Sequence, residues 1–457
     1  MPTITYELSE WAAGLKYEDL TDEAVDAAKR FLYDSLGCGL GGYQQEDCRI
    51  MLEYARARGG NPEATCIGSG FRTNVFEAAL LNALMIRAMD FNDIYWKQDP
   101  SHPTDIIPAA MSIVEWKRLS GRELIVGIVL GHEMEMRWCE AAIPGIRERG
   151  WHHAALTSFV SPMVASRMLG LSPEQMQHAI GISACPSMCL GAPTAGKLTM
   201  MKNTVDPMAT QVGVRAALLA QLGYTGPEHV VDGKEGIMHC LGESWDLGKL
   251  TDGLGERFKI VDCGMKAFPV EALTHSPLTA TLQIVHNNDF APDDIEEITV
   301  ETIARAADIL TDPAKYRPTS KETADHSMPY CLAVGIVDRK VTPEQFKLER
   351  IRDQALIPLM DKIKVVGSDE FEKLFPAKQP SRVTIRLRDG RSFSERVDVP
   401  KGDYRDPMSM DEIKVKFDAL AAPIFDQAHC DMIREAVLGL EDADVIDGLM
   451  ALLVERK

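Results

Sequence analysis

One short segment of the sequence concentrates groups that can transfer protons. Asp90 and Asp93 are followed by His102 and Asp105, and two prolines interrupt the stretch between and after them. Because proline does not continue a helix, we expect this segment to leave the preceding apolar helix as an irregular loop. Loops carried by a rigid scaffold often present functional side chains. Carboxylates and an imidazole in such a loop suggest general acid–base chemistry.

Residues of the same chemical kinds recur along the chain. His152 follows Gly150-Trp151, Lys202 and Lys266 lie in apolar surroundings, and Tyr330 ends the run Asp325-His-Ser-Met-Pro-Tyr. Each has an ordinary structural interpretation as a loop histidine, a surface lysine or a packed tyrosine. A carboxylate among apolar neighbours, such as Asp90, favours function because burial raises its pKa toward the range of a base. Taken together, these groups indicate proton transfer on a small anion.

Several other chemistries are disfavoured by what the sequence lacks. It contains no GxGxxG or GxxxxGK[ST] phosphate loop, no GxSxG nucleophile motif and no HExxH zinc motif. The ten cysteines are scattered and form no CxxC pair, which also disfavours an iron–sulfur site. Metal catalysis and covalent acyl chemistry are therefore less favoured than acid–base chemistry.

Composition limits the partners. There are 49 Lys+Arg against 68 Asp+Glu, a net charge of −19, which repels nucleic acid and anionic membranes. An anionic substrate would need a local cluster of cations. No apolar run reaches membrane-spanning length, and the first residues lack the pattern of a signal peptide. The expectation is a cytoplasmic protein with reduced thiols.

The elements that must position these groups are mostly helices. A chain of 457 residues is too long for one core, so two domains are expected. Helical periodicity and start signals predict helices over 22–36, 76–89, 107–119, 124–135 and 212–222, and from Ser172 and Ser409, with Asp90 at the end of the second. From residue 267 the pattern changes: strands are predicted at 295–302, 362–366, 383–388 and 391–399, and helices at 277–286, 330–337 and from Thr342.

The predicted fold is mainly α. A large all-helical domain comprises residues 1–266 and 405–457, and a smaller α+β domain, residues 267–404, is inserted into it.

The ordered set of motifs resembles the MmgE/PrpD family over essentially the whole chain. The pieces are Asp90-Phe-x-Asp93, His102-Pro-Thr-Asp105, Gly150-Trp-His152, Lys202, Lys266-x-Phe-Pro, Asp325-His-Ser-Met-Pro-Tyr330 and Asp406-Pro-Met-Ser409. The resemblance implies a homodimer without metal or organic cofactor, acting on small polycarboxylates by moving a proton beside a carboxylate. It implies catalytic roles for Asp90, His102, His152, Lys202, Lys266 and Tyr330, and substrate contacts for Asp93, Asp105 and His326.

The preferred hypothesis is a lyase that dehydrates a citrate-like substrate, as 2-methylcitrate dehydratases do. His152 or Asp90 would be the base, and His102 or Tyr330 the acid. Known activities of the family also include decarboxylation and epimerisation, so a decarboxylase or an epimerase is an alternative. The decarboxylases resembled have a Thr where this chain has Ile94, which disfavours decarboxylation. A polycarboxylate-binding protein without turnover is the non-enzyme alternative.

Overall fold

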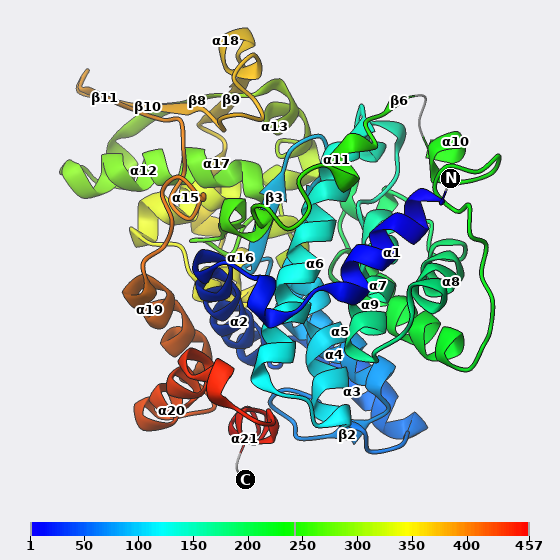
Figure 1. The fold of residues 1–457 in the computed structure, drawn as a ribbon. Helices are drawn as coiled ribbons and strands as arrows, with labels where there is room; N and C mark the ends of the chain where they lie inside the picture. The colour runs from blue at the N-terminus through cyan, green and yellow to red at the C-terminus, as the bar shows by residue number, and fades with distance from the viewer. Residues whose placement is uncertain (1, 242–243, 456–457) are drawn as a thin grey trace. The chain divides into compact units, whose positions relative to one another are not determined.

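The computed structural model describes residues 2–241 and 244–455 (Figure 1). The protein is mainly α. It divides into two compact units. Unit 1 comprises Met1–Ala192, Asn203–Cys263 and Ser409–Lys457, and unit 2 comprises Pro193–Lys202 and Gly264–Met408.

Unit 1 is built from helices. Its helices are α1 (Ile4–Gly14), α2 (Asp22–Gly42), α3 (Glu46–Arg58), α4 (Val75–Arg87), α5 (Ile107–Lys117), α6 (Gly121–Ala141), α7 (Ala154–Met168), α8 (Pro173–Ala184), α9 (Met201–Gln221, whose first two residues fall in unit 2), α10 (Ile237–Leu241), α11 (Gly248–Thr251), α19 (Met410–Ala421), α20 (Gln427–Leu438) and α21 (Asp447–Leu452). Helix α2 packs against α4, α6 and α19, and α6 packs against α5 and α7.

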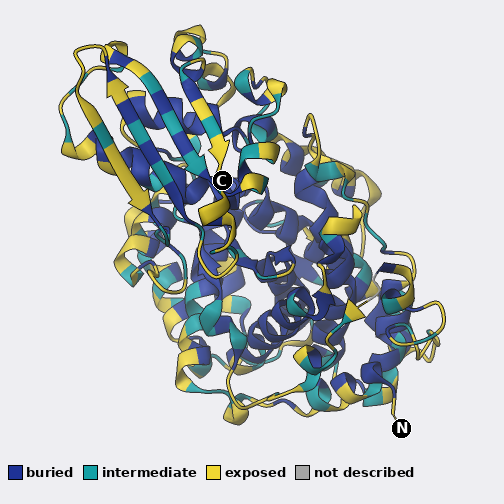
Figure 2. Ribbon diagram, turned by 90° about the horizontal axis from the view of Figure 1, so that it is seen from above, coloured by how far each residue is buried: buried dark blue, intermediate teal, exposed yellow. Residues whose placement is uncertain are grey.

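Local sequence explains where these helices begin. Ser172 and Ser409 accept hydrogen bonds from the third backbone N–H of α8 and α19, and Gln175 and Glu412 return bonds to the cap residues. Both predicted capping boxes are therefore confirmed. Helix α4 is the apolar helix of the sequence, and every residue from Ala78 to Arg87 is buried. Figure 2 shows such helices as a buried interior.

Unit 1 also contains short strands that the sequence did not reveal. They are β1 (Ala64–Thr65), β2 (Arg72–Thr73), β3 (Asp93–Trp96), β4 (Pro100–Ser101), β5 (Ala142–Ile143) and β6 (Ser244–Trp245). They pair antiparallel as β1–β2, β3–β4 and β5–β6. Strands of two to four residues carry too little alternation to be read from sequence.

Unit 2 contains a four-stranded sheet in the order β11-β10-β8-β9. The strands are β8 (Ile295–Thr302), β9 (Ile363–Gly367), β10 (Ser381–Leu387) and β11 (Ser392–Val397). Pairing is antiparallel except between β8 and β9, which run parallel. Residues Val383 and Ile385 of β10 are buried while the residues between them are less so, and the outer strand β11 is largely exposed (Figure 2). All four predicted strands are confirmed.

Helices complete unit 2. They are α12 (His275–Asn287), α13 (Ala304–Ile309), α14 (Lys321–Ala324), α15 (Met328–Asp338), α16 (Leu348–Ile351), α17 (Ile357–Met360) and α18 (Asp369–Glu372). Helix α12 packs against β10, β11 and α15. The helix predicted from Thr342 is reduced to a 3-10 turn, η9 (Pro343–Phe346). The capping box of Thr342 and Gln345 forms, but Lys347 is extended and ends the turn.

Two further properties of the described residues bear on function. None of their helices combines the length and hydropathy needed to cross a lipid bilayer. All ten cysteines are free thiols, and seven of them are buried.

Candidate active site

The acid-rich segment after α4 folds into a hairpin followed by a 3-10 turn. Strand β3 pairs with β4 through Tyr95–Ser101 and Trp96–Pro100, and η2 (Pro103–Ile106) leads into α5. The prediction that this segment is not a continuous helix is confirmed. Asp90, however, is not at the end of the helix: α4 ends at Arg87, and Asp90 adopts φ 51°, in the left-handed region that Asp tolerates better than most residues.

Arg87 connects two of the carboxylates. Its Nη1 donates to Asp90 Oδ1, and its Nε lies 3.5 Å from Asp105 Oδ2. All three side chains are buried. Burial raises the pKa of Asp105 well above its usual value, and the positive Arg87 offsets only part of that rise. Asp90 forms an ion pair with the same guanidinium.

Asp93 is enclosed by hydrogen-bond donors. Thr104 donates its backbone N–H to Oδ2 at 3.0 Å and its hydroxyl to Oδ1 at 2.5 Å, and Asn92 donates to Oδ1 at 3.2 Å. Burial raises the pKa of Asp93 to about 7, although the Thr104 hydrogen bonds oppose the rise. The carboxyl group therefore changes protonation near neutral pH.

His102 has a tautomer fixed by its neighbour. Its Nδ1 lies 2.6 Å from the backbone oxygen of Asp93, a carbonyl that can only accept, so Nδ1 carries the proton. In the neutral ring, Nε2 then holds the lone pair. The ring packs 5.6 Å from that of His153, centroid to centroid.

His152 has the opposite arrangement. Its Nδ1 accepts the backbone N–H of Ala154 at 3.1 Å, so the neutral ring carries its proton on Nε2. Burial, reinforced by the neighbouring imidazole of His153, holds the pKa of His152 well below its usual value. His152 is therefore a neutral ring that presents an N–H rather than a lone pair at Nε2.

His153 links the imidazoles to a further carboxylate. Its ring lies 4.1 Å from that of His152, and its Nε2 is 3.2 Å from Asp206 Oδ2, on α9. Burial alone would raise the pKa of Asp206, but His153, His152 and Arg87 together hold it below its ordinary range. We call the set Arg87, Asp90, Asp93, His102, Asp105, His152, His153 and Asp206 the acid–imidazole cluster; all of it lies in unit 1.

Unit 2 contains a second polar group, the lysine–aspartate cluster of Lys202, Lys321, Asp325 and His326. Asp325 Oδ2 accepts from Lys321 Nζ at 2.9 Å, and Oδ1 lies 2.6 Å from His326 Nδ1. Burial alone would raise the pKa of Asp325, but Lys321, Lys202 and His326 together lower it to about 2. Lys202 is buried at the start of α9. Asp325 is therefore ionised near neutral pH.

The other two predicted residues of unit 2 are buried as well. Lys266 follows the short strand β7 (Gly264–Met265) and is 1% exposed. Tyr330, in the first turn of α15, donates its hydroxyl to the backbone oxygen of Gln345 at 2.5 Å. Burial raises the pKa of Tyr330 above its usual value. A proton-donor role for Tyr330 would require this hydrogen bond to break.

Sequence reasoning brought Asp90, Asp93, His102, Asp105 and His152 into consideration, and the structure groups them. It did not single out Arg87 or Asp206, and of the adjacent pair His152-His153 it chose His152. Arg87 could have been found, because it is the one cation in a helix that is otherwise apolar nearly all round. Asp206 has no comparable local signal, because its partners come from segments distant in sequence.

Two surface cavities of unit 1 lie elsewhere. One, of about 530 Å³, is lined by residues that include Arg72, Glu115 and Arg118, and another, of about 300 Å³, includes Arg137 and Lys249. No member of the acid–imidazole cluster lines either cavity. We place the chemistry by the convergence of titratable groups rather than by cavity size.

Comparison with known proteins places most of the chain in one family. Residues 6–249 match the MmgE/PrpD N-terminal domain, and residues 268–442 match the MmgE/PrpD C-terminal domain. The cis-aconitate decarboxylase-like protein oryM of Aspergillus oryzae is 28% identical, over 98% of this chain and 97% of its own length. The cis-aconitate decarboxylase of Homo sapiens is 25% identical, over 99% and 95%. The 2-methylcitrate dehydratase of Salmonella typhimurium is 24% identical, over 86% and 84%.

Proposed function

Because the chain belongs to the MmgE/PrpD family, we propose that it is a lyase that removes water from a small citrate-like polycarboxylate by general acid–base catalysis, without a metal or organic cofactor. The observation that carries the proposal is the pair of opposite imidazole tautomers in one buried cluster. His102 holds a lone pair on Nε2, and His152 holds a proton on Nε2. Such a pair offers both a base and a hydrogen-bond donor.

We assign the base to His102. Its Nε2 takes the proton from the carbon beside a substrate carboxylate. The electrons of that C–H bond form a C=C bond as the C–O bond to the neighbouring carbon breaks. The imidazolium of His102 returns a proton to the departing hydroxyl, which leaves as water, so the enzyme ends unchanged. This assignment replaces the sequence-based expectation that His152 or Asp90 is the base.

His152 acts as a neutral donor in this scheme. A neutral imidazole is a weak acid, so we propose that its Nε2–H donates a hydrogen bond to a substrate oxygen and does not give up its proton. Burial suits this role because it keeps the ring uncharged. The chain itself therefore needs only one group, His102, to change protonation during turnover.

The lysines supply the positive charge that the reaction needs. Proton removal beside a carboxylate builds negative charge on that carboxylate, and a preorganised cation stabilises it. Lys202 and Lys266 are proposed for this role. Lys202 is among the groups that lower the pKa of Asp325, so the two side chains interact electrostatically.

Decarboxylation is the second candidate, and the comparisons favour it specifically. The relatives named cis-aconitate decarboxylases align over 98–99% of this chain, whereas the 2-methylcitrate dehydratases align over 86%. In that reaction a C–C bond would break with loss of CO₂, and a proton would be delivered to the carbon left behind.

Product analysis distinguishes the two reactions. Purified protein treated with a chelator is incubated with 2-methylcitrate, citrate and cis-aconitate. Proton NMR follows the organic product, and headspace analysis follows CO₂. The proposal predicts loss of water from a hydroxy-acid with no CO₂. Release of CO₂ from cis-aconitate, with no dehydration of the hydroxy-acids, would show that the reaction is decarboxylation. No turnover of any di- or tricarboxylate would favour a binding protein without activity.

A further inference from the structure

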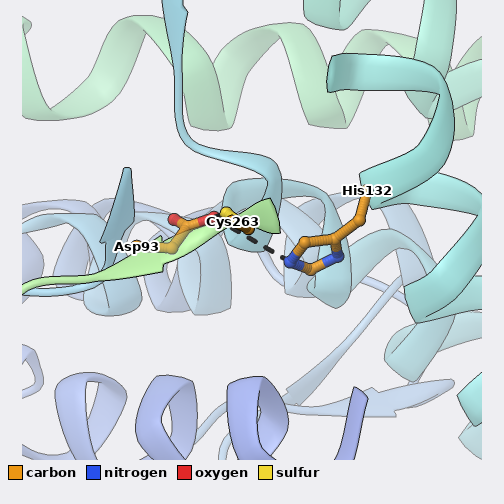
Figure 3. A group of neighbouring side chains, drawn as sticks. All are labelled: Asp93, His132 and Cys263. Carbon is orange, nitrogen blue, oxygen red and sulfur yellow. Dashed lines mark hydrogen bonds and ion pairs between the residues drawn. The ribbon is translucent and has the colours of Figure 1, made fainter. Parts of the chain in front are cut away.

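Three buried side chains of unit 1 meet beside the proposed base: Asp93 belongs to the acid–imidazole cluster and its backbone oxygen contacts His102, but the proposed reaction assigns no step to any of the three side chains. Asp93 begins β3, His132 lies in the middle of α6, and Cys263 follows η5 (Lys259–Asp262). Figure 3 shows the carboxylate, the imidazole and the thiol pointing toward one another. Their exposed fractions are 0%, 0% and 5%. We propose that these three residues bind a divalent cation of the zinc type.

The spacing fits such an ion. Asp93 Oδ2 lies 3.9 Å from His132 Nε2 and 3.6 Å from Cys263 Sγ, and the potential ligand atoms all lie within 4.8 Å of one another. Zinc bond lengths of roughly 2.0–2.3 Å at tetrahedral angles place ligand atoms about 3.3–3.6 Å apart. The Asp93–Cys263 distance of 3.6 Å already fits this spacing, and the Asp93–His132 distance of 3.9 Å is somewhat longer, so binding requires a modest closing movement of the three side chains.

The imidazole has its lone pair where the ion would lie. His132 Nδ1 is 2.9 Å from the backbone oxygen of Ile128, one turn earlier in α6, so the proton of the neutral ring is on Nδ1. Nε2 then carries the lone pair, and no group among the described residues donates a hydrogen bond to it. Burial lowers the pKa of His132 to about 4, so the ring is neutral at pH 7. An unpartnered buried acceptor of this kind indicates a missing ligand.

Hydrogen bonds hold the Asp93 carboxylate in place. Asp93 Oδ1 accepts hydrogen bonds from Thr104 and Asn92, and Oδ2, which faces the thiol and the imidazole, also accepts the Thr104 backbone N–H. Metal sites require such outer contacts because they fix the direction of each ligand. Phe31 packs against the His132 ring at 4.9 Å and limits its rotation.

Charge balance suits a buried position. On binding, the Cys263 thiol would release its proton to solvent and coordinate as thiolate. Thiolate and carboxylate together carry two negative charges, which the dication neutralises. A neutral complex avoids the cost of an unpaired buried charge. Three protein ligands leave a fourth position for a small molecule such as water.

A second group of three, His152, His153 and Asp206, also has ligand-like spacing. Its donors are already engaged: Ala154 N–H occupies His152 Nδ1, and His153 pairs with Asp206. It also lacks sulfur. A metal at this group would show no sulfur-to-metal charge-transfer band, which separates the two sites in one spectrum.

The test uses cobalt as a spectroscopic substitute for zinc. The full chain is produced in cobalt-supplemented medium, so that the buried site loads during folding. The exposed thiols Cys185 and Cys240 are first replaced by serine to remove surface binding. The proposal predicts about one cobalt per chain and an intense thiolate-to-cobalt absorption.

Single variants assign the ligands. In that background, Cys263→Ser should abolish the thiolate band. His132→Gln should weaken cobalt binding by more than the roughly 10- to 100-fold that loss of a supporting residue costs. Cys139→Ser, a buried cysteine outside the group, should leave both readings unchanged.

If either variant fails to fold, the cobalt content and spectrum of the protein that keeps Asp93, His132 and Cys263 still test the proposed site. The proposed site would be contradicted if protein grown in cobalt showed no thiolate-to-cobalt absorption, or if that absorption persisted in Cys263→Ser. Activity is a separate reading: loss of the proposed lyase reaction would leave the cobalt spectrum unaffected, so the two proposals fail independently.

Discussion

The acid–imidazole cluster of unit 1 and the lysine–aspartate cluster of unit 2 are both buried, yet the pKa values of Asp93 and Asp105 in the first and of Asp325 in the second are shifted in opposite directions. In unit 1, burial raises the pKa of Asp93 to about 7 and that of Asp105 well above its usual value. In unit 2, Lys321, Lys202 and His326 lower the pKa of Asp325 to about 2 despite its burial. Burial thus raises the pKa of Asp93 and Asp105 in the first cluster, whereas neighbouring cations keep Asp325 ionised in the second.

The comparison teaches that burial alone does not set the role of a carboxylate. The two clusters differ in the number of cations near each carboxylate. In unit 1 the single guanidinium of Arg87 interacts with several carboxylates, whereas in unit 2 two lysines interact with the single carboxylate of Asp325. In the proposed function, the residues assigned to proton transfer lie in unit 1, and the lysines assigned to charge stabilisation lie in unit 2.

Loss of the proposed base should have the largest effect. In His102→Gln the side-chain amide can keep the hydrogen bond to the Asp93 carbonyl, but it cannot take a proton. We expect kcat to fall by roughly 10² to 10⁴, the usual range for a general base. Steady-state kinetics on the substrate found by product analysis measure it, with His229→Gln as the control because His229 is largely exposed in the same unit. A decrease in kcat of less than tenfold would show that His102 is not the base.

Removing the one cation of the acid–imidazole cluster should mainly cost stability. Arg87→Met leaves Asp90 and Asp105 buried without their partner. Breaking a buried pair from one side costs about 3–5 kcal/mol. Urea unfolding measures it against Arg118→Met, whose ion pair with Asp447 is exposed and is worth about 1 kcal/mol or less. Equal shifts of the two midpoints would show that Arg87 does not balance the cluster.

Loss of fixed charge in unit 2 should lower catalytic efficiency without moving protons. Lys266→Ala should reduce kcat/KM by roughly 10² to 10³, the scale of one charge-stabilising donor. The exposed Lys364→Ala is the matched control in the same unit. A kcat/KM of Lys266→Ala close to that of the wild type would contradict the proposal that Lys266 contacts the substrate.

The protonation state of Glu135 gives a test of burial by pH. Its Oε1 accepts hydrogen bonds from Ser101 and Thr157, and burial raises its pKa to about 8. The folded protein keeps this proton up to about pH 8, whereas the unfolded chain loses it near 4.5. Stability of the wild type relative to Glu135→Gln should therefore fall as pH rises from about 5 to about 8, by up to about 1.4 kcal/mol per pH unit.

Unfolding free energies of both proteins across this range give the slope directly. The exposed Glu10→Gln should track the wild type at every pH. A wild type that instead gained stability relative to Glu135→Gln on raising the pH would mean that Glu135 is ionised in the folded protein.

The smallest effect is expected at Tyr330. Its hydroxyl donates to the Gln345 backbone oxygen, so Tyr330→Phe should cost about 1–3 kcal/mol of stability through that unpaired carbonyl. Turnover should change less than about tenfold. A fall of 100-fold in kcat, with stability intact, would restore Tyr330 as the acid of the original hypothesis.

The sequence predicted most of the regular structure because the signals are local. The capping boxes at Ser172 and Ser409 and the alternation in 295–302 need only a few neighbouring residues to be recognised. The hairpin around Asp389-Gly390 is equally local, since Gly390 adopts φ 90° at the turn. Asp90 was misplaced because its left-handed conformation is held by Arg87, a contact that periodicity does not encode.

Residue types could be chosen from the sequence, but their roles could not. His102 and His152 are both loop histidines in sequence, and only the Asp93 carbonyl and the Ala154 N–H distinguish their tautomers. Asp206 joined the cluster through contacts with residues far away along the chain. Such assignments depend on tertiary hydrogen bonds, which no pattern of residue spacing contains.

Solvent hydrogen exchange tests the central claim most directly, namely that His102 moves a proton beside a substrate carboxylate without a metal. Chelator-treated wild type, His102→Gln and His229→Gln are incubated with di- and tricarboxylates in deuterated water and followed by proton NMR. The account predicts deuterium incorporation next to a carboxylate for wild type and His229→Gln, and none for His102→Gln. Exchange that persists in His102→Gln, or that disappears from the wild type on chelation, would contradict it.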